Sequence, residues 1–328
     1  MVAGDGSFTS KVILLPIRLI LIAVIILGNV TTVKAIFKNR RLQTNTNLIL
    51  CSLGVCDIIN AFGLFGFIVR TFVIPELNCS NIYIHDLLNV LEIIPIAISL
   101  SHLVAIAIDR YVAIIWPFQY SQHFDQKMIF ALIISSWITG VLMLTTYGWW
   151  FINWDPTSCR SPIPAVFDYI IKGGFQFTMT PLLLILYVQI FNVSRQQRRK
   201  IHAMDVQMTS QQSSDQEKQN KSKRKEYKAA VLTLVVSLVA TGLWTPYFIL
   251  TAIVYLGFTS PLINVFLQIA IGLGYCNSAV NFFIYVLMNS ELRLAFREIW
   301  GIRRPSNAGG PNCVMVESAD RSSKGTTF

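Results

Sequence analysis

Residues 108–120 read IDRYVAIIWPFQY and place an acid, Asp109, directly before a base, Arg110, at the end of a long apolar segment. A charge inside the hydrocarbon of a membrane is costly unless it is paired or lies at the water edge. The doublet therefore predicts that this segment crosses a membrane and ends at its surface. The number of similar segments around it then decides the fold.

The composition indicates a membrane protein. Hydrophobic residues make up 53% of the 328 residues and charged residues only 13%, against about 25% in a typical soluble domain. A helix that spans a bilayer needs about 20 mostly apolar residues. Because the apolar runs lack the alternation of barrel strands, we expect an all-α bundle of seven transmembrane helices over residues 12–288. The seven runs are 12–36, 47–74, 83–115, 128–151, 165–192, 229–256 and 262–288.

The basic residues predict the orientation of the bundle. All but five of the 27 lysines and arginines lie in the C-terminal tail, or in and beside the loops that follow the first, third and fifth spans. Cytoplasmic loops are enriched in Lys and Arg, so we expect an extracellular N-terminal tail (1–11) and a cytoplasmic C-terminus in the plasma membrane. The net charge of +10 then favours contact with anionic membrane lipid, and we expect no nucleic-acid partner.

Three cytoplasmic segments differ in composition. The long loop 193–228 and the tail 301–328 are polar and rich in Ser, Gln and charged residues, which predicts disorder. Between them, residues 289–300 carry Leu292 and Phe296 on one face and Arg293 and Arg297 on the other. This spacing predicts a short amphipathic helix on the inner leaflet.

Cys79 and Cys159 are the only cysteines in the expected extracellular loops, and an oxidising compartment favours a disulfide between them. Asn78 begins a glycosylation sequon, although a bridged cysteine beside it hinders the modification. Cys313 in the tail is either a free thiol or a palmitoylation site. Three further cysteines lie within spans and are expected to be free thiols: Cys51, Cys56 and Cys276.

Further motifs lie in register with the Asp109-Arg110 doublet, and with them the chain resembles a rhodopsin-like (class A) G-protein-coupled receptor over residues 12–300. The resemblance implies an extracellular ligand, a heterotrimeric G protein on the cytoplasmic side, and an arrestin as a further partner. The motifs are Gly28-Asn29-Val30, SLGVCD at 52–57, Trp137, WTPY at 244–247 and NSAVNFFIY at 277–285.

Asp57 is a lone carboxylate in the middle of its span, where it must be protonated, paired or bound to an ion. The resemblance implies a sodium site around it, and we expect no cofactor other than this modulating ion. The alternative is that the same polar groups only connect helices. The residues placed around Asp57 by the resemblance are Asn29, Ser99, Trp244, Asn277 and Asn281.

The resemblance gives Arg110 the role of signal transmission: Asp109 and a second acid, Glu226, hold it until it is released to meet the G protein. Glu226 lies twenty residues before Pro246, but it also belongs to the mixed-charge run at 223–226, which is the alternative interpretation. Pro246 removes a helical hydrogen bond and supplies a hinge. The expected switch residues are Asp109, Arg110, Tyr111, Glu226, Pro246 and Tyr285.

The chain departs from the family pattern in several places. Phe282 stands where the seventh helix of the family has a proline, and Ala240 replaces an aromatic residue. Pro181 precedes Tyr187 by six residues instead of eight, which leaves the register of the fifth helix open. The usual cysteine at the top of the third helix would fall at His85. These changes affect the details of activation and not the fold.

Glu92 is an acid within the third span, and an intramembrane acid is most simply the counter-ion of a cationic ligand. In amine receptors an aspartate holds the corresponding position, with a tyrosine that matches Tyr275. The alternative is that Glu92 is protonated and bonded to Tyr275 as a structural link. Aromatic residues near Glu92 are expected to surround an ammonium group. They are Trp244, Tyr247, Phe248 and Tyr275, with Phe175 or Phe177.

Other functions have less support. A short peptide is the main alternative ligand, because Trp149, Trp150 and Trp154 enrich the second extracellular loop. A transporter or channel is disfavoured, since inverted repeats are missing and the deep acids are only Asp57 and Glu92. The four histidines lack metal-ligand spacing and no catalytic motif occurs, so we expect neither an enzyme nor a metal centre.

Overall fold

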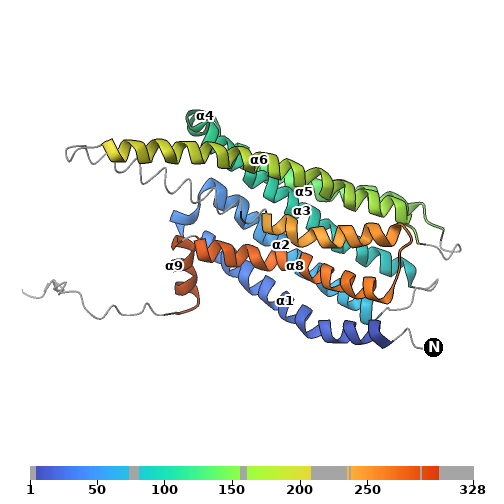
Figure 1. Ribbon diagram of the computed structural model, residues 1–328. Coiled ribbons are helices and arrows are strands. Elements are labelled where there is room, and N and C mark those ends of the chain that lie inside the picture. Colours follow the sequence, from blue (N-terminus) through green and yellow to red (C-terminus); the bar gives the residue numbers. More distant parts are fainter. Residues whose placement is uncertain are drawn as a thin grey trace, which may run out of the picture.

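The computed structural model describes residues 5–73, 81–155, 161–207, 235, 238–288 and 290–302. This part of the chain is almost entirely helical and contains no β-strand. Seven of its helices are long and apolar enough to cross a membrane (Figure 1). The chain is therefore a multi-pass membrane protein, and the predicted seven-helix bundle is confirmed.

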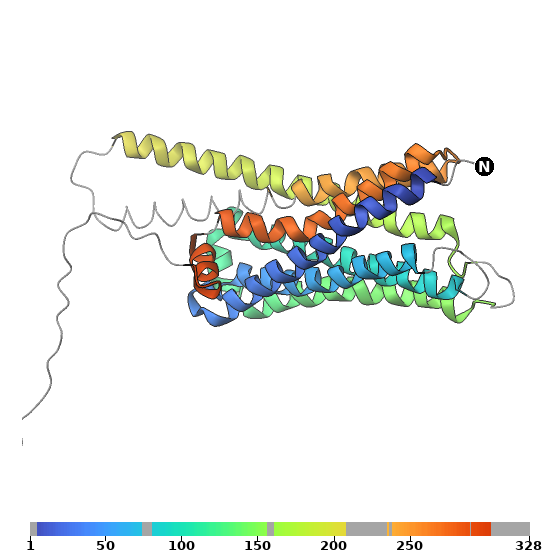
Figure 2. The same ribbon diagram turned by 90° about the horizontal axis from the view of Figure 1, so that it is seen from below.

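The spanning helices lie lengthwise beside one another (Figure 1, Figure 2). They are α1 (Asp5–Lys38), α2 (Asn45–Phe72), α3 (Ile82–Ile115), α5 (Gln126–Ile152), α6 (Ala165–Gln207), the span Leu238–Tyr255 and α8 (Pro261–Met288). Three short elements lie at the end opposite the N-terminus: η1 (Arg40–Leu42), α4 (Pro117–His123) and α9 (Ser290–Ile299). α9 crosses that end of the bundle and buries Leu292 and Phe296, so the amphipathic helix is confirmed.

Local signals set several helix ends. Thr44 and Asp125 accept hydrogen bonds from the backbone N–H groups of Asn47 and Met128, which caps the N-termini of α2 and α5. Gly301 follows the C-terminus of α9, and its φ of 65° places it in the left-handed region. The Ile302 N–H then bonds the carbonyl of Arg297 at 2.8 Å, as in a glycine C-cap.

α3 is the central helix of the bundle. It packs against α2, α5 and α6, and 72% of the residues in its most apolar stretch are buried, against 22% in α1 and α5. Most of α3 is therefore surrounded by other helices. Both Glu92 and Asp109 lie where they can contact several of these neighbours. The large apolar side chains exposed on the outer helices suit a lipid environment.

The segment that follows residue 193 differs from the expectation. Disorder was expected from residue 193, but α6 continues to Gln207 and projects beyond the other helices (Figure 2). The extension is rich in Gln, Arg, Lys and Met, which favour helix, and a helix that already exists needs no new nucleus to grow. Residues 208–228 lie outside the described part of the chain.

Phe282 fills a space between helices at the position where the family has proline. A Cβ placed on Gly28 of α1 would lie 2.7 Å from Cγ of Phe282. The ring also lies 5.2 Å from that of Phe296 in α9. The side chain of Phe282, which replaces the proline of the family, thus contacts both α1 and α9 from α8. Gly28 provides the space for its ring.

Gly28→Ala is expected to destabilise the protein by about 1–3 kcal/mol, because the methyl group overlaps Phe282 and neither helix can move without disturbing its neighbours. Thermal unfolding of the purified protein measures the effect. Gly272→Ala is the matched control, since a Cβ at Gly272 meets no atom within 4 Å and only raises helix propensity. Equal stability of the two variants would contradict the packing role of Gly28.

Candidate functional site

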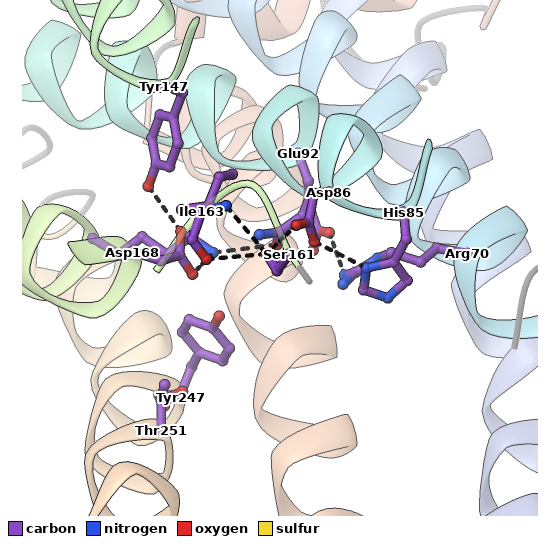
Figure 3. A network of polar contacts seen from close by, with 12 residues as sticks. Arg70, His85, Asp86, Glu92, Tyr147, Ser161, Ile163, Asp168, Tyr247 and Thr251 are labelled. Carbon is purple, nitrogen blue, oxygen red and sulfur yellow. Dashed lines mark hydrogen bonds and ion pairs between the residues drawn. The ribbon is translucent and has the colours of Figure 1, made fainter. Parts of the chain in front are cut away.

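Glu92 of α3 does not stand alone. Its Oε2 accepts a hydrogen bond from Nη2 of Arg70 at 2.8 Å, and both side chains are largely buried (Figure 3). Arg70 lies in the last turn of α2, 22 residues earlier in the sequence. The predicted counter-ion of a ligand is therefore already paired with a cation of the protein, which the sequence analysis did not foresee.

A second ion pair lies across the pocket. Nζ of Lys172 in α6 is 2.8 Å from Oδ2 of Asp168 and 3.2 Å from Oδ1 of Asn89. The Tyr147 hydroxyl donates to the other oxygen of Asp168 at 2.9 Å (Figure 3). Lys172 thus has two polar partners, Asn89 in α3 and Asp168 in α6, and Tyr147 of α5 in turn positions Asp168.

The expected aromatic residues gather beside Glu92. The ring of Trp244 lies 5.8 Å from Tyr247, 5.9 Å from Tyr275 and 6.4 Å from Phe248. Gly274 of α8 allows this approach, because a Cβ there would come within 2.5 Å of the indole. Phe177 contacts Phe248, whereas Phe175 packs against another hydrophobic cluster of the core.

A small cavity separates the charged and aromatic groups. Its volume of about 10 Å³ suffices for about one water molecule, so the pocket is closed around its own side chains. Opening it requires that at least one ion pair or aromatic ring moves. The lining residues are Asn89, Glu92, Ile93, Ile96, Lys172, Trp244, Tyr247 and Ile271.

Arg18 of α1 is a third buried cation near Glu92. Only 2% of the residue is exposed, and its Nη2 donates to the backbone carbonyl and to Oε1 of Gln268 in α8. Its guanidinium lies 4.6 Å from the ring centre of Phe67, and that of Arg70 lies 5.2 Å from the same ring. Arg18 also interacts electrostatically with Glu92.

The segment that follows Cys159 is hydrogen-bonded to the N-terminal part of α3. Ser161 donates a hydrogen bond to Oδ2 of Asp86, and His85 lies 3.3 Å from the other carboxylate oxygen (Figure 3). The predicted disulfide between Cys79 and Cys159, like the sequon at Asn78, lies outside the described residues. The polar contact at Asp86 makes a connection between the same two parts of the chain.

Asp57 accepts hydrogen bonds from three side chains. The Ser278 hydroxyl is 2.7 Å from Oδ1, the Asn281 amide 3.0 Å from Oδ2, and the Ser99 hydroxyl 3.4 Å from Oδ1. Ser99 and Asn281 were expected, but Ser278 was missed. Its neighbour Asn277 is buried, and Asn29 donates to the Ser278 backbone carbonyl.

Two buried carbonyl oxygens near Asp57 have no hydrogen-bond partner within the described structure, Oδ1 of Asn60 and Oδ1 of Asn281. Asn60 donates its amide to the Ser278 hydroxyl at 3.0 Å, so both amides belong to the same cluster. Carboxylate, hydroxyl and amide oxygens are the ligands that hard cations prefer. The donor set therefore fits a sodium ion.

At the other end of α3, Asp109 is fully buried and holds Arg110. Nε and Nη2 of Arg110 lie 3.0 and 2.7 Å from its Oδ2. Thr46 of α2 donates to the same oxygen at 2.7 Å, and Tyr120 of α4 donates to Oδ1 at 2.9 Å. The expected doublet is thus one part of a four-residue cluster, and the sequence analysis missed Thr46 and Tyr120.

The Tyr120 hydroxyl remains protonated at physiological pH. Burial, and then the negative charge of Asp109, raise the pKa of Tyr120 from 10 to about 12. Since the folded-state pKa is the higher one, the stability that this group contributes is complete below pH 10. It is lost as the pH rises through about 12.

Tyr120→Phe is expected to cost about 0.5–1.5 kcal/mol of stability at pH 7, because Asp109 loses one hydrogen bond. Melting temperatures of the two proteins, measured as a function of pH, test this. Near pH 12 the stability difference should vanish; a difference that is constant from pH 8 to 12 would contradict the assignment.

A buried histidine that the sequence analysis left without a role connects three helices. Nδ1 of His102 donates to the carbonyl of Ile98, and Nε2 is hydrogen-bonded to the Ser52 hydroxyl, both at 2.8 Å. The Trp137 indole in turn donates to Ser52 at 3.0 Å. This motif tryptophan therefore belongs to a structural network that joins α2, α3 and α5.

The remaining predicted residues are placed as follows. Tyr111 packs edge-on against Trp116, and Pro246 lies within the span Leu238–Tyr255. Tyr285 belongs to α8, but its side chain is outside the described structure, as are Glu226 and Cys313. The predicted free thiols are confirmed at Cys51, Cys56 and Cys276.

Comparison with known proteins defines the class. The family of 7 transmembrane receptors (rhodopsin family) matches residues 28–285, so the chain belongs to the rhodopsin-like, or class A, G-protein-coupled receptors. It is accordingly a receptor and not an enzyme.

Similar curated proteins are receptors named for amines. The histamine H2 receptors of Cavia porcellus and Homo sapiens are 26% identical over 313 residues, which are 90% of this chain and 82% of those receptors. The octopamine receptor beta-2R of Chilo suppressalis is 26% identical over 326 residues, covering 89% of this chain and 81% of that receptor.

Proposed function

We propose that this receptor binds a small cationic amine at Glu92 and activates a heterotrimeric G protein in response. The observation that carries the proposal is a buried carboxylate on the central helix, adjacent to a cluster of four aromatic rings. Such rings stabilise an ammonium group through their π faces. Similarity to receptors named for histamine and octopamine, both amines, supports the same ligand class.

The signal would pass along the bundle from Trp244. A ligand that shifts this ring acts on the hinge at Pro246 in the same helix, and the hinge moves the cytoplasmic end of that helix. Release of Arg110 from Asp109 then exposes the guanidinium to the G protein. Glu226 is the second acid of this switch, Tyr111 and Tyr285 complete it, and a sodium ion at Asp57 stabilises the inactive arrangement.

The arrangement in the cell follows the charge distribution. Residues 1–11 are extracellular, 12–288 form the transmembrane domain of a plasma-membrane protein, and 289–300 lie on the anionic lipid of the inner leaflet. The loop 193–228 and the tail 301–328 are cytoplasmic, and the phosphorylated tail is the site for an arrestin. Cys79 and Cys159 form the extracellular disulfide.

A short peptide is the second candidate ligand. The tryptophans that suggested it are partly used within the protein: Trp154 stacks on Tyr83 with centroids 5.4 Å apart, and Trp150 packs on Phe167 at 5.2 Å. They therefore help to build the outer rim. Trp149 is exposed and remains available to a peptide.

A signalling screen of biogenic amines and short peptides, on the receptor and on Glu92→Gln, tests the proposal. We expect an amine to activate the receptor and Glu92→Gln to lose at least about 100-fold in potency, as for removal of a buried charged partner. An amine that activates both proteins equally would refute the counter-ion role. Activation by peptides alone would favour the second candidate.

A further inference from the structure

The charged side chains around Glu92 are balanced by one another. Of three cations in this part of the bundle, Arg70 forms an ion pair with Glu92 and Lys172 with Asp168, while Arg18 is bonded to Gln268. A third carboxylate, that of Asp86, lies six residues before Glu92 on α3 and contacts Ser161 and His85 (Figure 3). A cationic ligand would therefore add a positive charge that no further carboxylate among these described groups balances.

Arg70 would be left unpaired by a simple amine. An ammonium group that takes Oε2 of Glu92 displaces Nη2 of Arg70, which lies 2.8 Å from that oxygen. A largely buried guanidinium without a partner is strongly unfavourable. Lys172 does not face this loss, because Asp168 and Asn89 hold its ammonium group.

The guanidinium groups also have unused donors. Nε of Arg70 and Nη1 of Arg18 are buried without a hydrogen-bond partner among the described residues. Nε and Nη2 lie on the same edge of the Arg70 guanidinium, and this edge binds a carboxylate through two parallel hydrogen bonds. One half of that edge is now bonded to Glu92, and the other half is free.

We infer that the ligand is a zwitterion of amino-acid type, whose ammonium group binds Glu92 and whose carboxylate binds Arg70. The inference rests on the proposed function, and it specifies the amine further. Such a ligand replaces the internal ion pair by two intermolecular ones and leaves the charge of the pocket unchanged. A simple amine lacks a partner for Arg70, and a simple acid lacks one for Glu92.

Matched pairs of compounds test this inference: histidine with histamine, tyrosine with tyramine, and tryptophan with tryptamine. The members of each pair differ only in the carboxylate. Each compound is assayed for G-protein activation and for its effect on the melting temperature of the purified receptor. Wild type, Arg70→Gln, Arg70→Lys and Lys127→Gln are compared, the last being a cytoplasmic control with an exposed side chain.

We expect at least one amino acid to activate wild type with higher potency than its amine. Arg70→Gln should weaken that amino acid by about 10- to 150-fold, the factor for a charge-assisted hydrogen bond, while the paired amine keeps or gains potency. Arg70→Lys, which keeps the charge but lacks the two-donor edge, should fall between them. Because Arg70→Lys retains a cation beside Glu92, it remains informative if Arg70→Gln folds poorly.

Three results would overturn the inference. One is an amine that acts more strongly than its amino acid on wild type; if it needs Glu92, the proposed function stands without the zwitterion. Another is an amino acid whose potency is the same in wild type and Arg70→Lys. The last result is that no amino acid in the set activates or stabilises wild type. If the amines also fail to activate or stabilise it, the proposed function is contradicted as well.

Discussion

Glu92→Gln is expected to lower the free energy of unfolding by about 3–5 kcal/mol, in addition to removing the response to ligand. The loss of one carboxylate leaves Arg70 unpaired in a mostly buried position, with Arg18 and Lys172 nearby. A neutral amide of the same shape cannot compensate these charges. Thermal unfolding and ligand response are measured on the same preparation.

The double variant Arg70→Gln/Glu92→Gln separates stability from recognition. Removing both charges eliminates the unpaired guanidinium, so much of the lost stability should return, whereas the response to an ammonium ligand should not. If the single and double variants are equally stable, the ion pair does not contribute as its geometry implies. A double variant that responds like wild type would show that the ligand binds elsewhere.

Asp57→Asn is expected to abolish the effect of sodium on agonist affinity. In wild type, sodium should weaken agonist binding by about 5- to 150-fold, the usual range of coupling between two sites. Asparagine retains the shape of the side chain and one of the two oxygens that accept hydrogen bonds from Ser278 and Asn281, but it removes the charge that attracts the cation. Binding is measured with sodium and with a large organic cation at the same ionic strength.

Asp125→Asn is the control for this measurement. Asp125 caps α5 on the surface, and asparagine caps a helix as well as aspartate does, so this variant should retain the full sodium effect. Sodium sensitivity that persists in Asp57→Asn would contradict the site. Insensitivity of wild type itself would mean that the cluster only connects helices.

The spans and their number could be predicted because a membrane helix has a required length and composition that one segment shows by itself. The pairing of Glu92 with Arg70 could not, since it depends on how α2 and α3 face one another. A signal was nevertheless present: Arg18, Arg70 and Lys172 are three of the five basic residues outside the regions that were predicted to be cytoplasmic. Each basic residue that departs from the enrichment of Lys and Arg in cytoplasmic loops was a candidate for an ion pair with a buried acid.

The errors at Asp57 and Asp109 have a related cause. Ser278 and Asn277 are adjacent in sequence but point about 100° apart on a helix, and the packing of α8 decides which of them meets Asp57. Tyr120 contacts Asp109 because α4, which begins at Pro117, places it beside the C-terminal end of α3. Contacts of this kind depend on the rotation of helices and on loop geometry, which periodicity leaves undetermined.

The most direct test of the whole account is nucleotide exchange on a purified heterotrimeric G protein, with the receptor in a lipid bilayer. Wild type should accelerate exchange when an amine-bearing ligand is added. Arg110→Ala should bind the same ligand with similar affinity, because Arg110 lies at the opposite end of α3 from the pocket. It should accelerate exchange at least about tenfold less, because we propose that Arg110 acts on the G protein. Equal acceleration by both proteins, or none by wild type with its ligand bound, would contradict the account.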